Sequence, residues 1–89
     1  MSDVEEWALY AKRVGLNLQK ARLAKGYSQE RVAYDAGLSK VQYQRLENGG
    51  FAGDPPSNPT IRTLMAVCQI LGVRPDDVLP EPWPDLHAR

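Results

Sequence analysis

The chain has 89 residues, 43% of them hydrophobic, and its 11 basic residues balance 11 acidic ones, so its length suits one small domain with a modest core. Its single cysteine, Cys68, lies in an apolar helical run, which excludes an internal disulfide framework and predicts a reduced thiol in the core. No stretch is long enough to cross a membrane and the acidic start differs from a secretory leader, so we expect a cytoplasmic protein.

The first predicted helix runs from near Val4 to Lys25. Its apolar residues recur at spacings of three and four, which is the period of one helix face. Gly15 lowers the helix propensity in the middle of this segment, whereas Gly26 ends it. The apolar face consists of Val4, Trp7, Ala8, Ala11, Val14, Leu18 and Ala21.

Two short helices are predicted next, over residues 29–36 and 40–48, with a tight turn at Gly37 between them. Ser28 and Ser39 precede the two helices as N-caps, and Gly37 can take the left-handed backbone that a sharp turn requires. Small alanines allow the helices to cross closely, while larger apolar residues of the second helix point back at the first. The inner faces comprise Val32, Ala33 and Ala36 in the first of these helices, and Tyr43 and Leu46 in the second.

The remaining chain predicts a long loop, two further helices and a tail. Glycines and prolines over residues 49–59 exclude both helix and strand there. A fourth helix begins after the N-cap Thr60 and stops at Gly72, and a short fifth helix follows over residues 75–79. We expect the proline-punctuated tail to be poorly ordered unless Trp83 docks. No segment alternates as a strand would, so the predicted fold class is all-α.

Several short motifs along these elements share a spacing that is more specific than any one of them. They are Arg22 and Gly26 ending the first helix, Ser28 and Gln29 opening the second, Ala33 and residues 36–39 at the turn, residues 46–49 closing the third helix, and Pro59, Thr60 and residues 71–73 around the fourth. In these residues the chain resembles the lambda-repressor-like, Cro/C1-type helix-turn-helix family, also called the XRE family. The resemblance covers residues 14–79 and implies a compact five-helix bundle that binds operator DNA, usually as a dimer. Residues 1–13 would then be a helical extension and residues 80–89 a Pro-rich tail.

The charges are unevenly distributed although they sum to zero. Residues 12–45 hold eight basic and two acidic residues, whereas residues 1–11 and 46–89 each carry a net charge of −3. The positive charge therefore coincides with the helix-turn-helix and the helix before it, where a phosphate backbone would lie. A solvated helix face is the alternative interpretation, because charge runs are usually that. The coincidence with the motif favours DNA.

The outer face of the second motif helix carries side chains suited to reading base edges. Arginine pairs bidentately with guanine, glutamine pairs with adenine, and valine can contact a thymine methyl group. We expect base contacts from Lys40, Val41, Gln44 and Arg45. The resemblance also assigns phosphate binding to the start of the first motif helix, where free N–H groups favour an anion. The expected phosphate contacts are Ser28, Gln29, Gln42 and Asn48, and for each candidate the alternative is an ordinary solvated side chain.

The resemblance implies a salt bridge between Arg22 and Glu47 that holds the recognition helix in place. Three features depart from the family pattern. Tyr43 occupies a position that is usually aliphatic, so its hydroxyl must reach the surface or find a partner. The loop over residues 49–59 is longer than usual and has no basic residue. The extension brings in aromatic and aliphatic side chains that are either core or a partner surface, namely Trp7, Leu9 and Tyr10.

Together these features predict a sequence-specific transcriptional regulator, most simply a repressor that binds palindromic operator DNA as a homodimer. The dimer surface is expected around Val78, Leu79 and Trp83, with the N-terminal extension as the alternative. An antitoxin-like regulator that also binds a partner protein, and a protein-interaction module on the same fold, are the competing hypotheses. His87 is the only histidine, and neither catalytic sets nor metal-ligand spacings occur, so we expect no enzyme activity, metal or cofactor.

Overall fold

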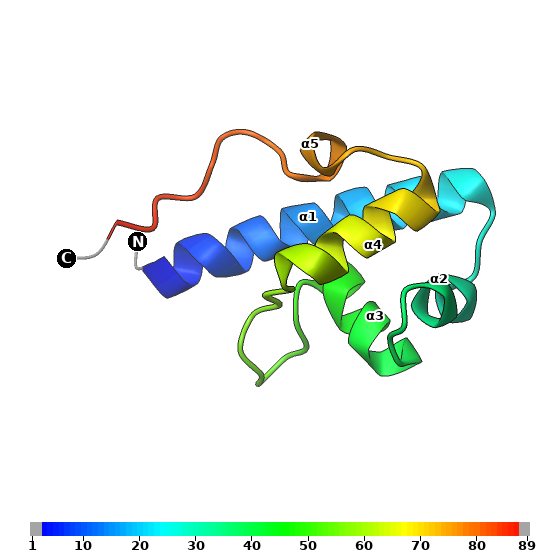
Figure 1. Ribbon diagram of the computed structural model, residues 1–89. Coiled ribbons are helices and arrows are strands. Elements are labelled where there is room, and N and C mark those ends of the chain that lie inside the picture. The colour runs from blue at the N-terminus through cyan, green and yellow to red at the C-terminus, as the bar shows by residue number, and fades with distance from the viewer. Residues whose placement is uncertain (1–2, 88–89) are drawn as a thin grey trace.

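The computed structural model describes residues 3–87, which fold into five α-helices and contain no strand. In chain order the helices are α1 (Asp3–Lys25), α2 (Gln29–Asp35), α3 (Lys40–Asn48), α4 (Ile61–Leu71) and α5 (Pro75–Val78). α1 runs the length of the molecule, with α2 and α3 on one side of it and α5 on another (Figure 1). The predicted all-α bundle is therefore confirmed. No helix within residues 3–87 is long and apolar enough to cross a membrane.

α1 is one continuous helix even though Gly15 lies near its middle. Gly15 is buried at the point where α1 crosses the C-terminal end of α3. A Cβ atom on Gly15 would lie 2.3 Å from the carbonyl oxygen of Glu47 and 2.6 Å from that of Leu46. The glycine therefore allows close approach of two backbones and does not interrupt the helix.

Hydroxyl side chains begin three of the helices. Ser28, Ser39 and Thr60 have extended backbones, and each hydroxyl accepts a hydrogen bond from a backbone N–H in the first turn of the helix it precedes. These caps lie where the sequence pattern placed them, so the starts of α2, α3 and α4 agree with the predicted starts.

Glycines with a left-handed backbone end α3 and α4. Gly49 has a φ of 71° and Gly72 a φ of 69°. Beyond Gly72, the Val73 N–H donates to the Cys68 carbonyl at 3.0 Å, which is the six-to-one bond of a Schellman motif. α2 ends one residue earlier than predicted, because Ala36 forms its C-cap and belongs to the turn.

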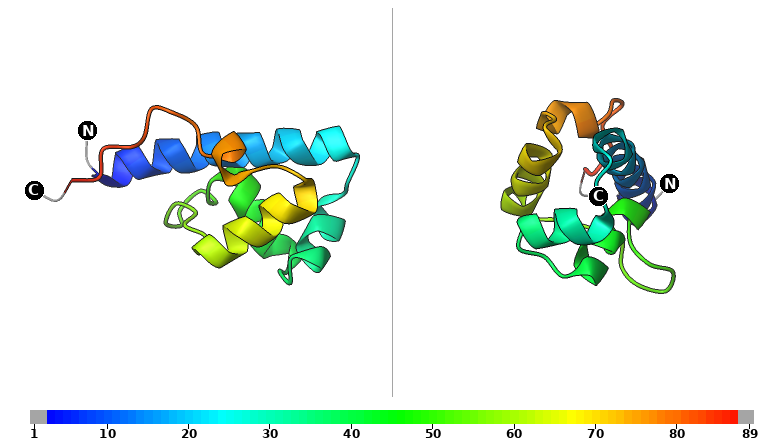
Figure 2. Two further views of the ribbon diagram at one scale, coloured as in Figure 1. Left: turned by 45° about the horizontal axis from the view of Figure 1, so that its top comes forward. Right: turned by 90° about the vertical axis from the view of Figure 1, so that its right-hand side faces the viewer.

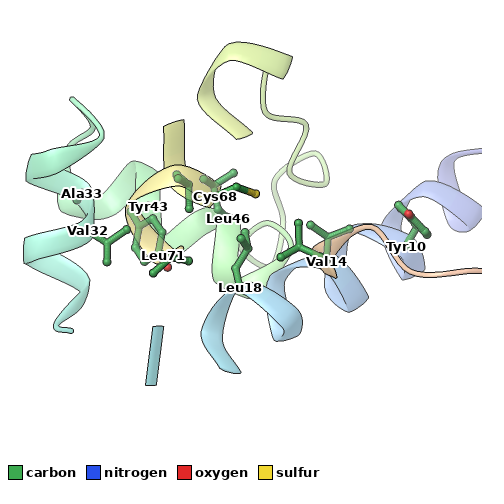
Figure 3. Packing of buried hydrophobic residues seen from close by; sticks show 11 residues of the cluster. Tyr10, Val14, Leu18, Val32, Ala33, Tyr43, Leu46, Cys68 and Leu71 are labelled. Carbon is green, nitrogen blue, oxygen red and sulfur yellow. The ribbon is translucent and has the colours of Figure 1, made fainter. Parts of the chain in front are cut away.

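One hydrophobic core joins all five helices (Figure 3). Tyr43 fills its centre with 0% of its surface exposed, and Val78 of α5 is 1% exposed. The Cys68 thiol is buried as expected, and burial raises its pKa. Val78 therefore serves the core and offers no surface to a partner. The core residues are Tyr10, Val14, Leu18, Val32, Ala33, Tyr43, Leu46, Val67, Cys68, Leu71 and Val78.

The tail runs back along the N-terminal half of α1, so both ends of the described chain lie on one side of the molecule (Figures 1 and 2). The Arg13 guanidinium donates to the carbonyl of Glu81 at 2.6 Å and to that of Pro82 at 3.2 Å. Trp83 lines a surface pocket together with Leu9 and keeps 61% of its surface exposed. From the sequence we expected a poorly ordered tail unless Trp83 docked, whereas in the structure Arg13 holds the tail through its backbone carbonyls.

Candidate nucleic-acid interface

The turn between α2 and α3 fixes how the two helices cross. Gly37 has a φ of 72°, and the Leu38 N–H donates to the Ala33 carbonyl at 2.8 Å. α3 then begins with a capping box, in which the Ser39 hydroxyl accepts from the Gln42 N–H and the Gln42 side chain accepts from the Ser39 N–H. Turn and cap together leave little freedom in the direction of α3.

A buried ion pair joins α3 to α1. Arg22 Nε lies 2.6 Å from Glu47 Oε2, and Arg22 Nη2 lies 3.1 Å from Glu47 Oε1. The two side chains are only 11% and 2% exposed. Arg22 Nη1 also donates to the Tyr27 carbonyl at 2.9 Å, which ties the α1–α2 connection to the same guanidinium. The bidentate geometry holds the C-terminal end of the recognition helix against α1.

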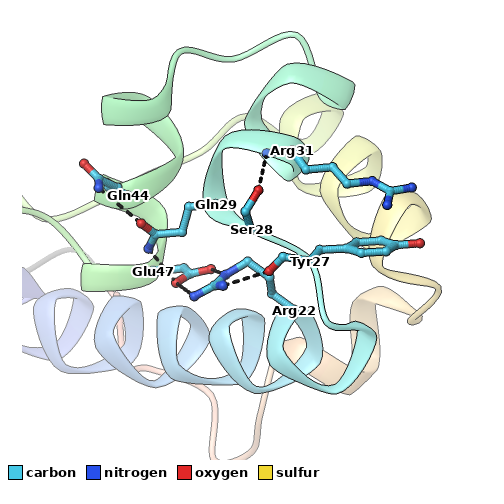
Figure 4. A network of polar contacts seen from close by, with 7 residues as sticks. All are labelled: Arg22, Tyr27, Ser28, Gln29, Arg31, Gln44 and Glu47. Atoms are coloured by element: carbon cyan, nitrogen blue, oxygen red, sulfur yellow. Dashed lines mark hydrogen bonds and ion pairs between the residues drawn. The ribbon is translucent and has the colours of Figure 1, made fainter.

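Two glutamines extend this pair towards the surface (Figure 4). Gln29 Nε2 donates to Glu47 Oε1 at 3.0 Å, and Gln44 Nε2 donates to Gln29 Oε1 at 3.1 Å. The side chain of Gln29 therefore turns inward to α3, although its backbone remains at the N-terminus of α2. A continuous chain of hydrogen bonds leads from buried Arg22 to partly exposed Gln44.

The electrostatics of the pair keep both groups ionised. Burial opposes ionisation of Glu47, but hydrogen bonds from Arg22 and Gln29 outweigh it and lower the pKa of its carboxyl. The hydrogen bond to Glu47 raises the pKa of Arg22. Neither charge is left without a partner in the low-dielectric interior.

Tyr43, an aromatic residue where the family pattern is usually aliphatic, is buried beside this pair. Burial raises the pKa of its phenol, and the neighbouring Glu47 carboxylate raises it further, so the group stays neutral. Within residues 3–87 its hydroxyl makes no hydrogen bond. From the sequence we expected the Tyr43 hydroxyl to reach the surface or to find a partner. In the structure it is buried, and no hydrogen bond from residues 3–87 satisfies it.

Lys40 and Val41 lie in the first turn of α3 and face away from the core. Val41 is 60% exposed, and Lys40 Nζ lies 3.3 Å from Glu30 Oε1 in an exposed pair. Such a pair is weak in water, so a DNA phosphate or base can compete for the ammonium group. Gln44, one further turn along, shares this side of the helix with Val41.

Arg45 lies differently from the other predicted base-reading residues. Its side chain is partly buried against the loop between α3 and α4, and Nη2 donates to the Pro55 carbonyl at 2.7 Å. Its Nε is buried and has no hydrogen-bond partner in the part of the chain that the structure describes. From the sequence we expected only that this loop is unusually long and has no basic residue. In the structure it borders α3 and orients the Arg45 side chain.

Of the four predicted phosphate-binding residues, Gln29 turns its side chain inward and the other three are exposed. Ser28 and Gln42 are exposed but already serve as helix caps, so their remaining hydrogen-bonding capacity would be shared with DNA. Asn48 is exposed at the end of α3. Within residues 3–87 no group of three or more His, Cys, Asp and Glu side chains is placed to hold a metal ion.

Two contacts near this surface were not predicted from the sequence. The Trp7 indole N–H donates to the Ser57 carbonyl at 2.9 Å, which attaches the loop to the N-terminal half of α1. The Arg31 guanidinium lies 4.0 Å from the centre of the Tyr27 ring. The sequence contained a partial indication of the Trp7 contact, because the helical spacing of Trp7 with Ala11 and Val14 placed its ring on the core side of the helix.

Comparison with known proteins supports the same assignment of the motif. Residues 18–78 match the family model described as helix-turn-helix. The chain belongs to this family, as the Cro/C1-type resemblance implied. It is similar to an uncharacterized HTH-type transcriptional regulator of the SPbeta prophage of Bacillus subtilis, YonR, with 37% identity over 65 residues. It is also similar to the uncharacterized HTH-type transcriptional regulator y4dJ of Sinorhizobium fredii, with 39% identity over 62 residues.

The matches cover different shares of the two relatives. The match to YonR covers 73% of this chain and 55% of that protein, and the match to y4dJ covers 70% and 73%. The chain therefore spans little more than half the length of the Bacillus relative. The matched residues 18–78 include α2, α3 and both residues of the buried Arg22–Glu47 pair.

Proposed function

We propose that this helix-turn-helix protein is a sequence-specific DNA-binding transcriptional regulator. The observation that carries the proposal is the geometry of α3, whose inner side is fixed by the Arg22–Glu47 pair while Lys40, Val41 and Gln44 face outward. Rigid presentation of such side chains suits insertion into the major groove. Both relatives bear names that describe them as HTH-type transcriptional regulators.

In this proposal the protein acts as a repressor and binds a palindromic operator as a homodimer. α3 has only 9 residues, so one copy reaches the edges of few base pairs. A second copy on a half-site about one helical turn away would double the contacts and match protein symmetry to operator symmetry. The protein would work on the chromosomal DNA in the cytoplasm, without catalysis or cofactor.

We place the dimer surface at the outer side of α1 and the tail. The sequence offered the tail region and the N-terminal extension as alternatives, but Leu9 and Trp83 line the same surface pocket. Both are exposed, whereas Val78 and Tyr10, named in the two alternatives, are buried in the core. We therefore propose one dimer surface that includes both Leu9 of the N-terminal extension and Trp83 of the tail.

Selection of binding sites from random DNA by the purified protein tests the function. We expect recovery of a short palindromic sequence, with affinity that falls at least about tenfold as salt rises from 50 to 200 mM, because phosphate contacts release counterions. Recovery of no sequence preference would contradict the proposal. Absence of any salt-dependent binding would instead favour a protein-interaction module.

A further inference from the structure

The loop between α3 and α4 is fixed at one point to the N-terminal half of α1. The Ser57 carbonyl accepts the Trp7 indole N–H at 2.9 Å, and Ser57 itself is buried. The Ser57 N–H donates to the Gly49 carbonyl at 3.0 Å, so the far end of the loop returns to the C-terminus of α3. Trp7 lies outside residues 18–78, the part of the chain that matches the helix-turn-helix family.

The same loop orients Arg45. The Pro55 carbonyl, close to Ser57 in the chain, accepts from Arg45 Nη2 at 2.7 Å. The Gly50 N–H donates to the Arg45 carbonyl at 2.9 Å, so the loop contacts both the backbone and the side chain of this residue. An arginine side chain has many rotamers, and fixing it before binding lowers the entropy lost when it engages a base.

From these contacts we infer that Trp7 is a positioning residue for Arg45, acting through Ser57 and the Pro55 carbonyl. The hydrogen bond from Trp7 fixes the loop, the loop fixes the guanidinium, and the guanidinium then meets its base with a defined geometry. The inference rests on the proposed function in so far as Arg45 reads DNA. The positioning itself is a property of the free protein and can be measured without DNA.

Gly50 provides a second, independent way to disturb the same contact. Its φ is 106°, and a Cβ atom there would lie 3.0 Å from the Pro55 carbonyl oxygen. Gly50→Ala therefore strains the loop backbone and moves the oxygen that holds Arg45 while Trp7 remains intact. Trp7→Phe does the converse, because it leaves Gly50 intact and removes the N–H donor, together with the five-membered ring that carries it, while an aromatic ring remains on α1.

The first test uses the free protein and hydrogen exchange followed by NMR. In Trp7→Phe we expect the Ser57 amide to exchange about fivefold faster or more, and the Arg45 Nε–H signal to broaden or shift. Tyr10→Phe is the control, because it removes the polar hydroxyl group of a neighbouring aromatic ring of α1, and it should leave both signals unchanged. Unchanged signals in both Trp7→Phe and Gly50→Ala would overturn the inference.

The second test measures discrimination on the selected operator. At the base pair whose identity matters less after Arg45→Ala, Trp7→Phe should reduce discrimination about threefold or more, with non-specific affinity unchanged. In an Arg45→Ala background Trp7→Phe should have no further effect, and an undiminished effect there would overturn the inference. Failure of the unaltered protein to bind DNA would count against the proposed function, while the exchange measurement would still decide whether Trp7 positions Arg45.

Discussion

Arg22 and Glu47 show how one residue pair links stability to the presentation of α3. The guanidinium and carboxylate are nearly inaccessible to water, and each makes further hydrogen bonds to Tyr27 or Gln29. Desolvation offsets much of the attraction within such a pair, but removing one partner leaves the other charge buried and uncompensated. Removing one partner should therefore change the free energy of unfolding by more than the intact pair contributes to it.

Glu47→Ala should destabilise the protein by about 3–5 kcal/mol, because it leaves the Arg22 guanidinium buried without its counter-ion. Chemical denaturation monitored by circular dichroism measures the change. Glu30→Ala is the control, since Glu30 lies in an exposed pair with Lys40, and it should change the free energy of unfolding by no more than about 0.5 kcal/mol. Equal effects of the two substitutions would show that the Arg22–Glu47 pair is not formed in solution.

The same carboxylate predicts a pH dependence. The pKa of Glu47 lies below its ordinary value of 4.5, so the unfolded chain binds a proton before the folded one as the pH falls. Its contribution to stability is fully present above pH 4.5 and is lost as the pH falls through the folded-state pKa. Denaturation midpoints measured at several pH values from about 7 to 3 should therefore fall further in the unaltered protein than in Glu47→Gln. Equal decreases of the midpoint in the two proteins would contradict a lowered pKa of Glu47 in the folded state.

The exposed residues of α3 should separate by the kind of DNA contact they make. Gln44→Ala and Arg45→Ala should each reduce discrimination at one base pair of the operator half-site by about 1–3 kcal/mol, because both side chains can bind base edges bidentately. Lys40→Ala, if Lys40 serves phosphate, should weaken specific and non-specific binding alike and reduce the salt dependence. Titrations against a panel of single-base variants measure both effects. If all three proteins keep the affinity and specificity of the unaltered chain, α3 does not read the DNA.

Among the elements, the helix starts and most helix ends followed from local chemistry. A serine or threonine cap and a left-handed glycine each act within one turn of the chain, so the sequence alone predicts them. The same local logic misjudged Gly15, because helix propensity contains no information about a second backbone. What makes glycine necessary there is the carbonyl of Glu47, which only the folded chain brings within reach.

Gly15→Ala should destabilise the protein by about 3 kcal/mol, although alanine favours an isolated helix, because its Cβ would overlap the α3 backbone. Gly26→Ala separates this clash from backbone strain. Gly26, unlike the helical Gly15, has a positive φ, of 74°, but an added Cβ meets open space, so a loss of only about 1–2 kcal/mol from backbone strain is expected. Thermal melting of both variants compares them. A smaller loss in Gly15→Ala than in Gly26→Ala would mean that α1 and α3 lie further apart.

The long loop shows where sequence reasoning stops at this scale. Its glycines and prolines excluded helix and strand correctly, but no local pattern links Trp7 to Ser57 or Arg45 to Pro55. These contacts depend on how α1, α3 and the loop meet after folding. The residues of the candidate surface therefore stay a prediction from the motif, whereas the internal partners of Gln29, Gln42 and Arg45 could not be predicted from the sequence.

On the scale of the whole molecule, the tail and the N-terminal half of α1 form one end, whereas α2 lies towards the other end of α1 (Figure 2). Arg13 fixes the tail backbone there, and this leaves the Trp83 and Leu9 side chains facing solvent. An aromatic and an aliphatic side chain exposed together suit symmetric association more than either does alone.

We expect two copies of the chain on one operator, because α3 alone contacts too few base pairs for high specificity. Analytical ultracentrifugation of the protein with the selected operator should give a two-to-one complex. Trp83→Ala and Leu9→Ala should each weaken its cooperative formation, whereas Leu23→Ala, an exposed leucine at the opposite end of α1, should not. A strictly one-to-one complex on the full palindrome would exclude the dimer.

The most direct test of the central claim, that α3 reads bases in the major groove, is methylation interference on the selected operator. Methylation of guanine N7 places a methyl group in the major groove at the atom an arginine or lysine would approach. We predict that methylated guanines block binding in two groups about one helical turn apart, on the same face of the duplex. Binding that tolerates N7 methylation throughout the operator would contradict the account.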